Sequence, residues 1–171
     1  MLKNKILPTV VLTSICVIVA LLLALANMFT APVIERAQKE KVAEALRVVY
    51  PEGESFEPIA LDGKGLPGNI TEAYAVNDGG FVFKAEVSGY KSGLVIMVGV
   101  NPDGAITDTK YVESQETNGA ENKLDGAYNG MTADNLDGVI IAGSTKTSAG
   151  YRDAVSASLS AYAILKGESA K

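Results

Sequence analysis

GFVFKAEVSGYKSGLVIMVGVNPDGAITDTKYVESQ, residues 80–115, sets the architecture of this chain. The stretch holds three runs rich in β-branched and aromatic residues, which predict strands within 80–90, 93–101 and 104–115. NPDG at 101–104 separates the second and third runs, as a tight turn does between antiparallel strands. The succession of short strands and tight turns predicts an antiparallel sheet.

The segments on either side extend this pattern. EAYAVND at 72–78 predicts another strand, and NDGG at 77–80 predicts the turn that follows it. The glycine- and proline-rich passage 53–68 is typical of a loop or linker. Apolar residues recur at helical spacing in 34–51, where Pro51 ends the pattern, and again in 151–167. We therefore expect an α+β fold, with a bent antiparallel sheet flanked by helices.

The front of the chain is strongly apolar. No charged residue occurs from Ile6 to Ile34, and a helix of this length spans a bilayer core of about 30 Å. Pro8 falls in its first turn, and Pro32 lies where such a helix is expected to stop. We predict a transmembrane anchor at 1–34, a juxtamembrane helix and linker at 35–68, and a globular domain at 69–171.

Two questions about the anchor stay open at this stage. A cleaved signal peptide is the alternative to a permanent span, although the apolar run exceeds the usual length of about 7 to 15 residues. The orientation is also undecided, because basic residues occur on both sides of the apolar segment. They are Lys3 and Lys5 before it, and Arg36, Lys39, Lys41 and Arg47 after it.

The inventory of reactive residues excludes several functions. The chain has no histidine, and its one cysteine, Cys16, lies in the apolar segment, so nucleophilic triads and histidine-rich zinc sites are excluded. Outside the anchor, thirteen basic and twenty acidic residues leave a net charge of about −7, which argues against nucleic-acid binding. Glu113, Glu116 and Glu121 form an acidic cluster that we interpret as solvated. We expect no metal site and no autonomous catalytic site.

AGSTKTSAG, residues 142–150, surrounds one lysine with four hydroxyl side chains and two glycines. Gly143 permits a backbone turn that a Cβ would obstruct, and such a turn can expose the hydroxyl of Thr145. The alternative is purely structural, since serine and threonine before a helix often serve as N-caps.

In order along the chain, these features resemble the FMN-binding domain family, in particular the G subunits of Rnf electron-transport complexes and the related C subunits of sodium-pumping NADH:quinone oxidoreductases. The resemblance rests on the N-terminal span, on GYKSGLVIMVGVNPDGAI at 89–106, on ETNGAE at 116–121 and on AGSTKTS at 142–148. It implies that residues 69–171 form an FMN-binding domain. It also implies that Thr145 carries FMN through a phosphoester made by a separate flavin transferase.

The resemblance implies the surroundings and role of this cofactor as well. The hydroxyls and backbone before the last helix, together with Lys146, would bind the flavin phosphate, and the 116–121 loop would face the ring. The implied cofactor residues are Thr145, Gly143, Ser144, Lys146, Thr147, Ser148, Glu116 and Thr117. The implied protein is a single-pass membrane subunit with its domain outside the cytoplasm. It would relay electrons among the other subunits of an ion-translocating ferredoxin:NAD oxidoreductase.

The signature departs from the family pattern at Ala142, Ser144 and Asn118, where Ser or Thr, Ala and Pro are usual. This supplies an alternative function, a non-redox accessory subunit of the same fold that has lost flavinylation.

Overall fold

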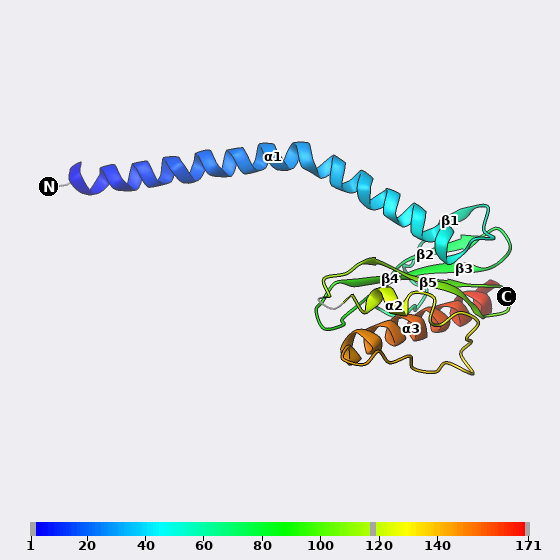
Figure 1. The fold of residues 1–171 in the computed structure, drawn as a ribbon. Coiled ribbons are helices and arrows are strands. Elements are labelled where there is room, and N and C mark those ends of the chain that lie inside the picture. Colours follow the sequence, from blue (N-terminus) through cyan, green and yellow to red (C-terminus); the bar gives the residue numbers. More distant parts are fainter. Residues whose placement is uncertain (1–2, 117–118, 170–171) are drawn as a thin grey trace. The chain divides into compact units, whose positions relative to one another are not determined.

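The structure is a computed structural model of the 171-residue chain and describes residues 3–116 and 119–169. It divides into two units, of which the first ends at Lys41 and the second, here called the globular unit, begins at Val42. Figure 1 shows the order of the elements, from the long helix α1 through five strands to the final helix α3.

The apolar front of the chain is helical, as predicted. Helix α1 spans Lys3–Val49, and its large apolar side chains from Val10 to Ile34 are exposed. Within the described residues, α1 is the one helix long and apolar enough to cross a membrane, and the mean hydropathy of its most apolar 18-residue stretch is 2.7. The sequence therefore correctly indicated a candidate transmembrane span.

The expected stop at Pro32 is wrong, because α1 continues through this residue to Val49. Proline removes one backbone N–H donor, a loss that helices in membranes tolerate when nearby turns stay bonded. The sequence after Pro32 is rich in Ala, Glu, Lys and Arg, which have high helix propensity, so the helix continues beyond the proline. The helix predicted over 34–51 is thus the last part of α1.

The predicted antiparallel sheet is present. Its strands are β1 Phe56–Ile59, β2 Ile70–Val76, β3 Phe81–Val87, β4 Leu94–Val100 and β5 Ile106–Glu113. They lie in the order β1-β2-β3-β4-β5, and each is antiparallel to the next (Figure 1). The predicted turns 77–80 and 101–104 join β2 to β3 and β4 to β5, with Gly79 and Gly104 at φ of 92° and 84°.

Strand β1 corrects the prediction that 53–68 is only a loop or linker. Its four residues, FEPI, include a proline, and the alternation of apolar and polar residues is too short to predict a strand. The segment is extended because it pairs with β2. Pro58 is tolerated because β1 is an edge strand, where one missing donor leaves the ladder to β2 intact.

Helical segments cover both faces of the sheet. Helix α3, Thr145–Ser169, packs on β2, β3 and β4 and forms the larger core with residues such as Phe83, Ile96 and Tyr151. The end of α1 packs through Leu46, Val49 and Tyr50 against the opposite face, which includes Val82 and Met97. All seven residues of β4 are buried as a result. A strand covered on both faces reads as a continuous apolar run, as LVIMVGV does.

Helix α3 begins at Thr145, six residues before the predicted start at Tyr151. The helical apolar spacing becomes visible only from Tyr151 because the preceding turn carries small and polar side chains. The hydroxyl-rich signature is therefore not a loop before the helix, since its second half is the first helical turn.

Candidate functional site

The signature lines a pocket of about 480 Å³ at one end of α3. This volume lies within the range of roughly 300–1,000 Å³ that is usual for small-molecule sites. Three separate segments of the globular unit contribute to its wall. The lining residues are Tyr90, Glu116, Gly143, Ser144, Thr145, Lys146 and Thr147.

Thr145 is the hydroxyl that this pocket presents to solvent. It is exposed as the first residue of α3, whereas Ser144 and Thr147 on either side are buried. Gly143 has a φ of +80° and open space where a Cβ would lie. The backbone therefore turns sharply before the helix without any side chain between Thr145 and solvent.

The first turn of α3 also provides an environment suited to an anion. Amide groups at a helix N-terminus lack intrahelical partners, and the helix dipole favours negative charge there. Lys146 is exposed in this turn and adds a positive charge to the pocket wall. A phosphate bound to Thr145 would thus lie beside backbone donors and an ammonium group.

Ser148 holds the turn together and does not line the pocket. Its side chain is 2% exposed, and its hydroxyl donates to the Ser144 carbonyl at 3.1 Å and accepts from the Ile141 amide at 3.0 Å. The Ser144 amide donates back to the Ile141 carbonyl at 2.9 Å. These bonds fasten the segment before α3 to the first helical turn.

Glu116 connects the three segments of the wall. Its carboxylate accepts hydrogen bonds from the Tyr90 amide at 3.1 Å, the Lys91 amide at 3.0 Å and the Thr147 hydroxyl at 2.5 Å. Its own amide donates to the Ser114 hydroxyl at 3.1 Å, and that hydroxyl donates to Glu121 at 3.1 Å. We call the bonds of Glu116 to Tyr90, Lys91 and Thr147 the Glu116 clamp.

The interpretation of the acidic cluster as solvated is therefore wrong for two of its members. Glu121 is 7% exposed, and Glu116 is partly buried within its clamp. Partial burial raises the pKa of Glu116, but the bonds from Lys91, Thr147 and Tyr90 outweigh this and hold the pKa below its ordinary value. Glu113 alone is exposed.

Two glycines allow the clamp to form. A Cβ at Gly89 would lie 2.7 Å from a carboxylate oxygen of Glu116, and a Cβ at Gly150 would lie 2.9 Å from the Ser88 carbonyl oxygen. The absence of both side chains lets the turn after β3 approach the first turns of α3. Tyr90 reaches the pocket for this reason.

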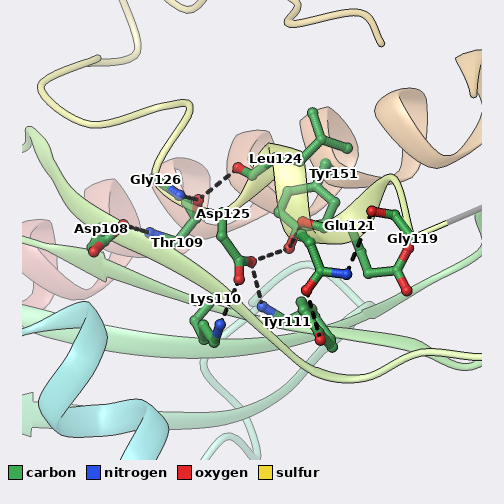
Figure 2. Close-up of polar contacts among 11 residues, drawn as sticks. Asp108, Thr109, Lys110, Tyr111, Gly119, Glu121, Leu124, Asp125, Gly126 and Tyr151 are labelled. Carbon is green, nitrogen blue, oxygen red and sulfur yellow. Dashed lines mark hydrogen bonds and ion pairs between the residues drawn. The ribbon is translucent and has the colours of Figure 1, made fainter. Parts of the chain in front are cut away.

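A second network holds α3 and the 119–126 segment in place beside the site (Figure 2). Asp125 accepts hydrogen bonds from Tyr151 at 2.6 Å and the Tyr111 amide at 2.9 Å, and pairs with Lys110 at 2.7 Å. Burial, then the bond to Asp125, raises the pKa of Tyr151, so its phenol stays protonated and donates. The short helix α2, Glu121–Leu124, is thereby fixed between β5 and α3.

The structure brings together most residues implied by the resemblance. Thr145, Gly143, Ser144, Lys146, Thr147 and Glu116 line one pocket, Ser148 lies behind it, and Thr117 falls outside the described residues. Sequence reasoning missed Tyr90 as a lining residue. The available signal was the doublet Gly89–Tyr90, a glycine followed by an aromatic residue directly after a strand.

Glu116→Gln tests the clamp through its pH dependence. An amide keeps the shape but replaces one accepting oxygen by a donor and removes the charge, so we expect a loss of about 1–2 kcal/mol at pH 7. Because the folded-state pKa of Glu116 is lowered, its contribution is present above the unfolded-state pKa and disappears as pH falls through the folded value. Urea unfolding of the two proteins should therefore converge in acid.

The exposed Glu113→Gln variant is the matched control and should unfold like the wild type at pH 7. A difference between Glu116→Gln and wild type that stays constant from neutral to acid pH would contradict an ionised clamp.

The charged residues of the chain do not gather into a metal site within the described part. Among residues 3–116 and 119–169, no group of three or more His, Cys, Asp or Glu side chains is placed to hold a metal ion.

Comparison with known proteins shows which class of domain this site resembles. Residues 89–160 match the model of the FMN-binding domain family. The matched range begins at Gly89 and includes every residue that lines the pocket. This part of the chain is similar to the FMN-binding domain family.

Two relatives extend the similarity to most of the chain. The chain is 27% identical over 166 residues to the G subunit of the proton-translocating ferredoxin:NAD(+) oxidoreductase complex of Clostridium ljungdahlii, with 91% of this chain and 83% of that protein covered. It is 28% identical over 176 residues to the G subunit of the Na(+)-translocating ferredoxin:NAD(+) oxidoreductase complex of Acetobacterium woodii, with 92% and 84% covered. The chain is thus related to the G subunits of Rnf-type complexes.

Proposed function

We propose that this chain is a membrane-anchored flavoprotein subunit that carries FMN covalently on Thr145. In this function it relays electrons within an Rnf-type, ion-translocating ferredoxin:NAD oxidoreductase complex. The observation that carries the proposal is the coincidence of the FMN-binding domain match with the pocket at the start of α3.

The residues of the pocket fit the cofactor. Thr145 offers an exposed alcohol for a phosphoester, and the first turn of α3 with Lys146 offers the donors and charge that a phosphate requires. Glu116 and Tyr90 also line the pocket, whose volume of about 480 Å³ leaves room for a group larger than phosphate. Bound FMN would supply one- and two-electron transfer, which none of the side chains lining the pocket provides.

The protein has three tasks in this function. The covalent bond at Thr145 keeps the cofactor at one place in every redox state, and the Glu116 clamp keeps the pocket wall rigid around it. The ionised Glu116 also places a negative charge in the pocket. This charge would oppose further negative charge on the ring and so lower its reduction potential.

The rest of the assignment follows from α1 and from the relatives. The candidate span supports a membrane location with a single pass, and we propose that the domain lies on the extracytoplasmic side. The partners would be the other subunits of the complex, and a flavin transferase would attach the cofactor. One relative is named as proton-translocating and the other as Na(+)-translocating, so we assign no coupling ion to this chain.

The decisive experiment is expression of the full chain with a flavin transferase, followed by mass spectrometry and in-gel fluorescence after denaturation. We expect a mass increase of one FMN less one water and a fluorescent band. A chain of unmodified mass and no fluorescence, from cells that flavinylate another target protein, would overturn the proposal in favour of the accessory alternative. The same mass also reports whether the apolar front segment is retained.

A further inference from the structure

We propose that Tyr90 is the aromatic platform on which the planar ring of the cofactor stacks. This inference rests on the proposed function and deepens it, because it assigns the part of the pocket that receives the ring. Neither the family match nor the names of the relatives give Tyr90 a role.

The exposure of Tyr90 requires an explanation. Its side chain is 64% exposed, and among the described residues of the globular unit the other exposed large apolar side chains are Val48 and Ile140. Tyr90 is the aromatic one of the three, and of the three it alone lines the pocket. An exposed aromatic ring at the edge of a ligand pocket gains its packing energy when a ligand covers it.

The backbone beneath the ring is held firmly. The amides of Tyr90 and Lys91 both donate to Glu116, and the Gly89 amide donates to the Lys91 carbonyl at 3.0 Å. A tyrosine side chain has few rotatable bonds, so a fixed backbone leaves the ring little freedom to lose on stacking. This arrangement suits a preformed binding surface.

The position of the ring relative to the attachment residue also fits. The ammonium of Lys146, the neighbour of Thr145, lies 5.8 Å from the centroid of the Tyr90 ring. A group tethered at Thr145 therefore enters a pocket whose wall already includes the phenol. The isoalloxazine ring is planar and electron-poor, and the electron-rich phenol is a suitable partner for offset stacking.

Flavin fluorescence provides a test that does not depend on electron-transfer activity. A tyrosine stacked on the ring quenches its emission by donating an electron to the excited state and recovering it, with no net reaction. Phenylalanine stacks similarly but is too hard to oxidise to quench. Native Tyr90→Phe protein should therefore fluoresce several-fold more than wild type, and Tyr90→Leu should in addition lose the induced visible circular dichroism of the flavin.

Tyr111→Phe is the control, since it removes the same hydroxyl from a tyrosine that does not line the pocket. It should be quenched like wild type. Fluorescence after denaturation and intact mass measure the amount of attached FMN in each protein. Full labelling with unchanged quenching in Tyr90→Phe would overturn this inference alone, whereas absence of FMN from every protein would overturn the proposed function and this inference with it.

Discussion

The Thr145→Val protein is expected to carry no covalent FMN and to keep its fold. Valine has nearly the shape of threonine but no hydroxyl, so no phosphoester can form at this position. The side chain is exposed at the first position of α3, and the substitution should change stability by no more than about 0.5 kcal/mol. Intact mass and in-gel fluorescence of protein expressed with the transferase measure the loss.

Thr147→Val separates the attachment role from the clamp. Thr147 is 3% exposed and donates to Glu116, so its hydroxyl is not presented to another enzyme. The variant should lose about 1.5–3 kcal/mol of stability, the usual contribution of a hydrogen bond to a charged group, but it should keep the label. A labelled Thr145→Val protein together with an unlabelled Thr147→Val protein would show that the attachment residue is assigned wrongly.

Gly99→Ala should destabilise the globular unit by about 2–3 kcal/mol, because it overpacks the junction between α1 and the sheet. A Cβ at Gly99 would clash with the Thr107 hydroxyl and with the carbonyl oxygen of Val49. That hydroxyl donates to the same carbonyl at 2.5 Å, so the methyl group would enter an existing hydrogen bond at the end of α1. Urea unfolding of the full chain in detergent measures the effect.

Gly68→Ala is the matched control, since open space surrounds the Cβ position there and the backbone does not need a glycine. It should unfold within about 0.5 kcal/mol of wild type. Equal stability of the two alanine variants would refute the tight contact at Gly99.

Local sequence signals predicted much of the fold. The alternation and turn residues between 72 and 115 gave β2 to β5 and the turns of the β2–β3 and β4–β5 hairpins, because strand and turn preferences act over a few neighbouring residues. The apolar run gave the helical span for the same reason. The failures at Pro32 and β1 have different causes, since α1 continues past Pro32 through the helix-favouring residues that follow it, whereas β1 is extended because it pairs with β2.

The candidate site was predictable only in part. The glycine and hydroxyl pattern of 142–150 identified the segment that carries Thr145, because that pattern is local. The resemblance to the family placed Glu116 near the cofactor, but the local sequence around Glu116 suggested a solvated side chain. No local pattern indicates that a carboxylate will accept two backbone amides and a hydroxyl from segments 25 to 31 residues away.

The amino-acid sequence alone was sufficient for strands β2 to β5, for the turns at 77–80 and 101–104, and for the apolar span. Folding in three dimensions was needed to place Tyr90 and Glu116 beside Thr145 and to bury Glu121. The reason is that these placements depend on how closely α3 approaches the turn after β3. That distance is set by the packing of α3 on the sheet and by the missing side chains at Gly89 and Gly150.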